Sequence, residues 1–135
     1  RKIQSQSTSN PSSISQAAAV EALNGTQSFI KKRAKSFSDR RNFVVNYLNN
    51  IPGITCLMPK GAFYVFPSCK GLIGKKTKIK NDTDFVQKLL EKQNVAVVQG
   101  SAFGLDGYFR ISYATSMQKL KVAMERIKVF CKSLG

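Results

Sequence analysis

The chain has 135 residues, 42% of them hydrophobic, and its 22 lysines and arginines against 7 aspartates and glutamates give a net charge of +15. This length suffices for one ordinary domain with its own core and is too short for two. The sequence contains no histidine, which excludes Ser-His-Asp and Cys-His nucleophiles, an imidazole base and histidine-ligated metals. The positive charge favours anionic partners, such as nucleic acid, acidic membranes or phosphorylated and carboxylated metabolites.

The cysteines and the first residues of the chain indicate the cellular compartment of the protein. Cys56, Cys69 and Cys131 are widely spaced and form no CxxC pair, so we expect neither a disulfide framework nor a metal site, and a reducing cytoplasm fits best. No apolar run approaches the ~20 residues of a membrane span. The start RKIQSQSTSN has neither a signal-peptide core nor an initiator methionine. We therefore expect a piece of a longer cytoplasmic protein.

Two helices are predicted in the first third of the chain. Residues 1–12 are polar and indicate an extended lead-in, with Pro11 in the first turn of a short helix that stops at the Asn-Gly pair of residues 24–25. From Thr26 as N-cap, apolar residues recur at three- and four-residue steps up to Leu48. This pattern predicts a long amphipathic helix ending before NNIPG. At ~1.5 Å per residue it would reach about 36 Å, which suits a connector between two bodies.

The middle of the chain predicts strands and a loop. Residues 53–59 and 61–67, GITCLMP and GAFYVFP, are rich in β-branched and aromatic residues and flank a Pro-Lys-Gly turn, which indicates a hairpin or a bent pair of strands. Residues 70–80 carry five lysines, two glycines and no acid. We expect a solvated loop there.

The last third predicts a helix, two strands and a final helix. Residues 81–93 open with capping residues and acids. Their apolar positions on one face are Phe85, Val86, Leu89 and Leu90. Residues 95–98, VAVV, indicate a buried strand, and residues 108–113, YFRISY, the last strand. Thr115 with Gln118 predicts a capping box for the final helix, whose buried stripe comprises Leu120, Ala123, Met124, Ile127, Phe130 and Leu134. The order ααββαββα indicates an α/β fold of layered α+β type, a sheet with helices packed on it.

Arg110 is the residue that most needs an explanation. Alternation along the strand places Phe109, Ile111 and Tyr113 on one face and Arg110 on the other, less apolar face. A guanidinium offers five donors in a planar fork that matches a carboxylate or a phosphate. It could therefore anchor a small anionic ligand. A structural salt bridge or an exposed strand arginine is the alternative that position and composition leave open.

Three other patterns have plain structural explanations beside functional ones. The turn QGSAFG could offer backbone N–H groups to an anion, but it matches no phosphate-loop spacing, and an ordinary turn explains it. The basic runs at residues 31–41 and 75–80 could contact nucleic acid, yet they equally suit solvated faces. The aromatics of GAFYVFP and GYFRISY could line a cleft or simply fill a core.

Four segments resemble, in order, the aspartate/prephenate group of class I aminotransferases, which depend on pyridoxal phosphate. They are residues 3–23 (IQSQSTSNPSSISQAAAVEAL), 58–67 (MPKGAFYVFP), 95–104 (VAVVQGSAFG) and 107–116 (GYFRISYATS). The resemblance covers essentially the whole sequence and implies roughly the C-terminal third of a fold-type I enzyme. It implies that residues 1–25 end the large cofactor-binding domain, and that residues 26–135 form the connector helix and the small C-terminal domain.

The resemblance also implies roles for particular residues. In the family the arginine of the FRISYA strand binds the substrate's α-carboxylate, which maps onto Arg110. The SQST-SNP segment resembles the strip near the neighbouring subunit's active site in a homodimer, so Ser7, Ser9 and Asn10 would approach a partner's cofactor. The family's Schiff-base lysine and its other cofactor-binding residues correspond to sequence before residue 1, and Lys2 does not match the S-K motif. By this resemblance the chain carries a substrate clamp, no catalytic residue and no bound pyridoxal phosphate of its own.

The interpretation is therefore a cytoplasmic enzyme of the aspartate/prephenate aminotransferase group, acting on amino acids and 2-oxo acids, of which this chain is a part that is inactive alone. Two rival hypotheses stay open. One is a stand-alone basic module that binds nucleic acid, which would bind DNA in a salt-dependent way. The other is an inactive truncated domain whose former interdomain surface mediates self-association.

Overall fold

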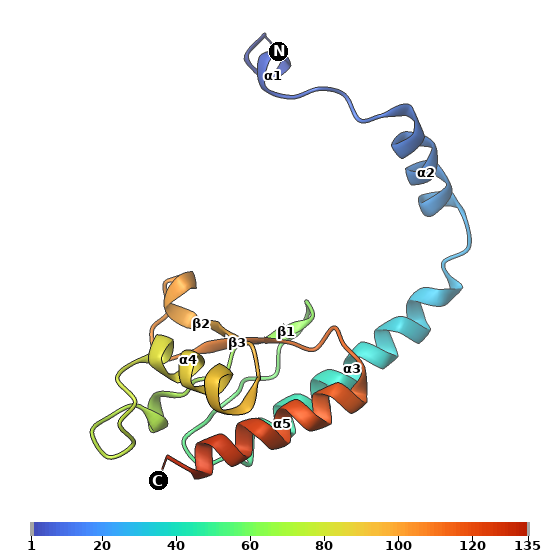
Figure 1. Cartoon of the computed structure of the whole chain (residues 1–135). Coiled ribbons are helices and arrows are strands. Elements are labelled where there is room, and N and C mark those ends of the chain that lie inside the picture. Colours follow the sequence, from blue (N-terminus) through green and yellow to red (C-terminus); the bar gives the residue numbers. More distant parts are fainter. Residues whose placement is uncertain (1, 135) are drawn as a thin grey trace. The chain divides into compact units, whose positions relative to one another are not determined.

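A computed structural model describes residues 2–134 and shows helices with one small sheet (Figure 1). The chain divides into two compact units, Arg1–Arg33 and Ala34–Gly135. In chain order the helices, 3-10 helices and strands are α1 (Lys2–Ser7), α2 (Ser13–Asn24), α3 (Ser28–Asn49), β1 (Tyr64–Val65), η1 (Lys70–Leu72), α4 (Asp82–Gln93), β2 (Val98–Gln99), η2 (Gly100–Phe103), β3 (Phe109–Ser112) and α5 (Met117–Lys132).

The first unit contains α1 and α2, and neither helix has a buried residue. The extended lead-in predicted for residues 1–12 is wrong at α1. There the hydroxyls of Ser5 and Ser7 donate to carbonyls three and four residues earlier, which supports a helical turn. The prediction of α2 is confirmed, but Pro11 precedes the helix instead of entering its first turn. Ser12 is the N-cap, and its hydroxyl accepts from the Ser15 N–H at 3.2 Å.

The long helix is confirmed as α3, which begins at Ser28, two residues after the predicted N-cap. Its apolar stripe is not buried over its whole length. Val44, Val45 and Leu48 lie in the core, whereas Phe29 and Ile30 are 46% and 47% exposed. The packing that stabilises α3 within this chain is therefore in its C-terminal half.

The sheet has the order β1-β3-β2, with both neighbouring pairs antiparallel. The prediction of a hairpin or a bent pair of strands at residues 53–59 and 61–67 is wrong in its pairing, because Thr55 makes a single antiparallel bridge to Ser68 and β1 pairs with β3. Asn49 explains part of this difference. Its side chain accepts from the Cys56 N–H at 2.7 Å and donates to the Cys56 carbonyl at 2.9 Å, occupying backbone groups that a second strand would need.

The strand predicted at VAVV is also mostly wrong. Only Val98 of this segment belongs to a strand, β2, and it is 36% exposed, while Val95 is buried outside the sheet. A run of β-branched residues gives strand propensity, but only the end of this run lies beside β3.

Helices α4 and α5 confirm the two helices predicted for the last third of the chain. The buried face of α4 and the N-cap of α5 differ from the prediction. Leu90 is 48% exposed and does not share the buried face of Phe85 and Leu89. The N-cap of α5 is Ser116, whose hydroxyl accepts from the Lys119 N–H at 3.3 Å, so the predicted cap at Thr115 is wrong by one residue.

The core of the second unit lies between the inner face of β3 and the helices. The Phe85 ring of α4 lies 5.0 Å from Phe109 of β3 and 5.4 Å from Phe130 of α5, centroid to centroid. In Figure 1, α5 runs beside the C-terminal part of α3, where the Tyr47 hydroxyl donates to Glu125. The predicted apolar stripe of α5 is confirmed at its buried members, Leu120, Met124, Ile127 and Phe130. The opposite face of β3 is thereby left for other contacts.

The loop of residues 70–80 is more ordered than the expected solvated loop. Its lysines are exposed, but Leu72 and Ile79 are buried at 7% and 1% exposure. The Gly74 N–H donates to the Ile79 carbonyl at 2.9 Å, and the Thr77 hydroxyl donates to the Leu72 carbonyl at 2.8 Å. Two apolar anchors and these hydrogen bonds hold the loop against the core. Its lysines therefore project from a fixed backbone.

Candidate functional site

Arg110 lies in β3, the central strand of the sheet, where its backbone pairs with Val98 of β2. The burial pattern of β3 alternates, with Phe109 and Ile111 buried and Arg110 half-buried. The predicted split of the strand's two faces is confirmed. The helices cover the face of Phe109, so the guanidinium lies on the sheet face away from the core.

Aromatic rings surround Arg110 on that face. The guanidinium carbon lies 4.4 Å from the Phe103 ring centroid and 5.0 Å from the Tyr64 ring centroid. The Phe66 ring in turn stacks on Tyr108, with 5.7 Å between centroids and 12° between planes, and meets Phe103 edge-on. The aromatics of GAFYVFP and GYFRISY thus include a group outside the core. Cation–π contacts orient a guanidinium without using its N–H donors.

No carboxylate within residues 2–134 lies within ion-pair distance of Arg110. The internal salt bridge that the sequence left open as an alternative is therefore not formed in the described part of the chain. The fork keeps its donors available to a ligand on the aromatic face of β3.

The turn QGSAFG positions Phe103 beside Arg110, and two of its backbone N–H groups have acceptors within the chain. The Gly100 N–H donates to the Tyr108 carbonyl at 2.7 Å, and the Ser101 N–H donates to the Asp82 carboxylate at 2.7 Å. Gly100 is required here, because a Cβ would lie 2.3 Å from the Leu105 carbonyl oxygen. The glycine pattern could have indicated a tight turn, but the contact of Phe103 with Arg110 depends on the η2 fold and is not visible in the sequence.

The other predicted site residues lie in the first unit. Ser9 and Asn10 line an open, polar surface hollow of about 800 Å³ together with residues of α1. The Ser7 hydroxyl instead donates to the Ile3 carbonyl at 2.9 Å. Ser7, Ser9 and Asn10 belong to the first unit and Arg110 to the second.

The three cysteines are unsuited to nucleophilic chemistry. Burial raises the pKa of Cys56 to about 11 and the pKa of Cys131 to about 12. Burial, with a further contribution from the Asp82 carboxylate, raises the pKa of Cys69 to about 12. All three thiols are protonated at neutral pH, and a protonated thiol is neither a nucleophile nor a metal ligand.

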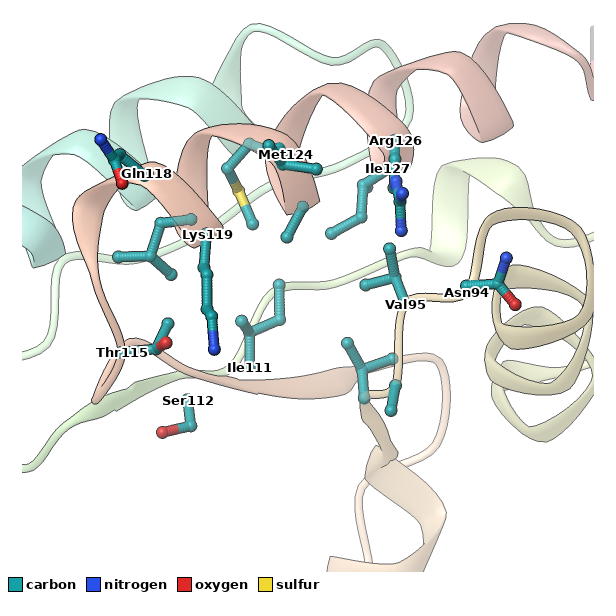
Figure 2. A pocket seen from close by; sticks show the side chains of 15 residues that line it. Asn94, Val95, Ile111, Ser112, Thr115, Gln118, Lys119, Met124, Arg126 and Ile127 are labelled. Atoms are coloured by element: carbon teal, nitrogen blue, oxygen red, sulfur yellow. The ribbon is translucent and has the colours of Figure 1, made fainter.

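An apolar groove lies on the helix side of the sheet, between α5 and the segment from Asn94 to β3 (Figure 2). Its volume is about 540 Å³, and Val95, Ile111, Met124 and Ile127 point into it. Arg110 does not line this groove. The guanidinium and the groove are therefore two separate features of the second unit.

The family of the chain follows from its sequence. The sequence model of the family described as aminotransferase class I and II matches residues 1–127. The chain belongs to this family. Membership implies dependence on pyridoxal phosphate, and the resemblance that the four sequence segments indicated is confirmed.

Similar proteins within the class I and II aminotransferases include aspartate and aspartate/prephenate aminotransferases. An aspartate aminotransferase of Rhizobium meliloti (strain 1021) is 59% identical over 98% of this chain and 33% of its own length. A probable aspartate/prephenate aminotransferase of Rickettsia typhi is 56% identical over 98% of this chain and 34% of its own. The chain thus spans about a third of the length of the curated relatives it matches.

Solved structures of aminotransferases share the fold. The crystal structure of the aspartate aminotransferase from Rhizobium meliloti matches with a TM-score of 0.92 and 58% identity, covering 98% of this chain and 34% of that one. An aspartate aminotransferase from Thermotoga maritima matches with a TM-score of 0.80 and 38% identity, covering 97% and 32%. The predicted fold class is confirmed: the chain is a part of a fold-type I aminotransferase with a small antiparallel sheet. None of the helices within residues 2–134 has both the length and the apolar character that crossing a bilayer demands.

The residues present do not make a covalent pyridoxal phosphate site by themselves. A lysine that forms a Schiff base at neutral pH needs a desolvated setting or a neighbouring cation to lower its pKa. No lysine within residues 2–134 is buried. Within the described residues, no lysine therefore has the buried setting that such a lysine needs.

Proposed function

We propose that this chain is the C-terminal part of an aspartate/prephenate-type aminotransferase and that Arg110 binds the substrate's α-carboxylate. The observation that carries the proposal is the state of Arg110, whose guanidinium contacts two aromatic rings and has no acidic partner in the described residues. A carboxylate is the anion that the planar fork matches in two parallel hydrogen bonds. Every amino acid and 2-oxo acid that a transaminase handles carries this group.

The contribution of this chain to the reaction is binding and orientation. Two charge-assisted hydrogen bonds, at about 1.5 to 3 kcal/mol each, fix the carboxylate and with it the direction of the substrate's Cα–H bond. The cofactor, when bound to the complete enzyme, acts as the electron sink for the bond that breaks at Cα. We infer that the Schiff-base lysine belongs to another part of a longer polypeptide, and the lack of a buried lysine among residues 2–134 supports this inference.

The proposal extends to the assembly. We infer a cytoplasmic homodimer in which Ser7, Ser9 and Asn10 approach the partner's cofactor. Ser9 and Asn10 line an open polar hollow, which supports the inference that another subunit can contact this segment. The residues of α1 and α2 have no buried members, which is consistent with a surface that another part of the enzyme covers.

A chimeric enzyme tests the clamp. This chain would replace the C-terminal third of the Rhizobium meliloti aspartate aminotransferase, which is 59% identical to it over that region. We expect the chimera to transaminate aspartate and 2-oxoglutarate. Arg110→Ala should lower kcat/KM by roughly 10²- to 10⁴-fold, the loss of two charge-assisted hydrogen bonds. The matched control Arg33→Ala, an exposed arginine of α3, should retain the parent rate. A parental kcat/KM for Arg110→Ala would refute the clamp.

An activity measurement on the isolated chain tests the inference that the Schiff-base lysine belongs to another part of the polypeptide. With pyridoxal phosphate, aspartate and 2-oxoglutarate added, we expect no turnover and no stable absorbance band of a cofactor bound covalently to the protein. Borohydride reduction followed by intact-mass measurement provides a second readout. Transamination by the isolated chain, or stoichiometric labelling of one specific lysine, would contradict this part of the proposal.

A further inference from the structure

Four lysines from two separate elements line one groove of the second unit, which we call the lysine groove. Its volume is about 520 Å³, and its lining residues are Lys76, Thr77, Lys78, Ile79, Lys88, Lys92, Ser133 and Leu134. A neighbouring cavity of about 370 Å³ shares Lys76 and Thr77 and adds Lys128 and Lys132. The lysines of the groove come from the loop after η1 and from α4, and α5 supplies the two further lysines of the neighbouring cavity. No aspartate or glutamate lines either cavity.

The charge of these six lysines is only partly compensated. Lys88 pairs with Asp84 at 2.9 Å, and Lys128 lies 3.8 Å from the Glu125 carboxylate. Within residues 2–134, the remaining four lysines have no carboxylate within 4.0 Å. Like charges held close together repel one another, and an anion bound between them relieves that repulsion.

The backbone beneath the lysine groove is fixed before any ligand binds. Ile79 is buried, and the Thr77 hydroxyl donates to the Leu72 and Gly74 carbonyls at 2.8 and 3.1 Å. Lys78 has a φ of 57°, in the left-handed region that a non-glycine residue seldom adopts, and its carbonyl accepts from the Lys88 ammonium at 2.8 Å. An ordered loop loses little conformational freedom on binding.

The lining residues favour one class of anion. Ammonium groups bind phosphate as point charges, whereas no arginine is present to offer a planar fork to a carboxylate. No aromatic side chain lines either cavity, so a nucleobase would have no ring to stack on. We propose that the lysine groove binds a compact anion with several phosphate groups, such as an inorganic triphosphate. This site is separate from Arg110 and does not depend on the proposed aminotransferase function.

Calorimetric titration of the 135-residue chain with sodium tripolyphosphate tests the site. We expect 1:1 binding that weakens between about 50 and 200 mM salt, because bound counterions are exchanged. The double variant Lys76→Ala/Lys92→Ala should weaken binding roughly 10-fold, since each exposed charge contributes modestly. The control Lys31→Ala/Lys32→Ala removes the same charge from exposed positions of α3 and should change the affinity less than about twofold.

Several outcomes would overturn the proposal. Equal losses in the two double variants would show that only the net charge of +15 attracts the anion. Undetectable binding at about 50 mM salt would remove the site altogether. If citrate bound as tightly as triphosphate, the proposed preference for phosphate over carboxylate would be wrong. A single-stranded oligonucleotide that binds more tightly, and loses affinity only with Lys76→Ala/Lys92→Ala, would assign the surface to nucleic acid. Should this double variant fail to melt cooperatively, the single variant Lys92→Gln takes its place in the same titration.

Discussion

At the residue scale, the central feature is a guanidinium held by aromatic rings instead of by a carboxylate. Phe103 and Tyr64 lie at 4.4 and 5.0 Å from the guanidinium carbon of Arg110. Such contacts limit the side chain's motion without using its five N–H donors. Phe103 comes from η2 and Tyr64 from β1, so the orientation of Arg110 depends on the packing of two other elements around β3.

Phe103 is therefore expected to act as a positioning residue. In the chimeric enzyme, Phe103→Ala should lower kcat/KM for aspartate roughly 3- to 10-fold, within the range of a cation–π contact. The loss should appear mainly in KM, because the carboxylate is held less well before and during the reaction. Phe103→Tyr should restore the parent value. Leu105→Ala, an exposed neighbour in the same turn, is the control; an equal loss there would indicate a general disturbance of η2.

At the scale of elements, the caps decide where the helices of the second unit begin. The sequence contains both Thr115 and Ser116 before α5, and the structure uses Ser116 as the N-cap. Ser116→Ala should lower the free energy of unfolding by about 1 kcal/mol, because the Lys119 N–H loses its partner. Thr115→Ala should change it by less than about 0.5 kcal/mol. Urea denaturation of both variants checks this, and the reverse ranking would place the cap at Thr115.

The start of α4 makes a prediction about acid stability. The backbone N–H of Lys80 and the ammonium of Lys88 each donate to Asp84 at 2.9 Å, which lowers the pKa of Asp84. A lowered pKa adds stability above the unfolded value of about 3.9, and that stability is lost as the pH falls further. Asp84→Asn should cost about 0.5 to 1 kcal/mol at pH 6.

The pH dependence separates this effect from a packing defect. By urea denaturation, the difference between the parent chain and Asp84→Asn should shrink as the pH falls from about 6 to about 3. Asp39→Asn serves as the control, since its pair with Lys35 is mostly exposed and should contribute little. A difference that stays constant over this pH range would mean that the carboxylate of Asp84 is not the source of the stability.

At the scale of the whole molecule, the elements with long apolar periodicity were predictable and the pairing of short strands was not. Helices α3, α4 and α5 follow from residues spaced three and four apart, and β3 follows from the alternation around Arg110. The partner of β1 could not be predicted, because the side chain of Asn49 occupies the backbone of Cys56 and so removes the expected hairpin. Such contacts between distant residues leave no local pattern in the sequence.

The candidate site shows the same division. Alternation along β3 separates Arg110 from the core, and the proposed role in binding the α-carboxylate comes from the resemblance to aminotransferases. The rings of Tyr64 and Phe103 reach it only through strand pairing and the η2 turn, which are properties of the tertiary fold. The same holds for the lysine groove, whose lining residues come from the loop of residues 70–80, from α4 and from the residues after α5.

The central claim is that Arg110 holds the group common to all transaminase substrates. Its most direct test compares single turnovers of aspartate and of alanine by the chimeric enzyme, with and without Arg110→Ala. Both substrates carry an α-carboxylate, and only aspartate carries a second one. We predict that Arg110→Ala lowers the specificity constants of the two substrates by the same factor, roughly 10²- to 10⁴-fold. A loss confined to aspartate would assign Arg110 to the side-chain carboxylate and contradict the account.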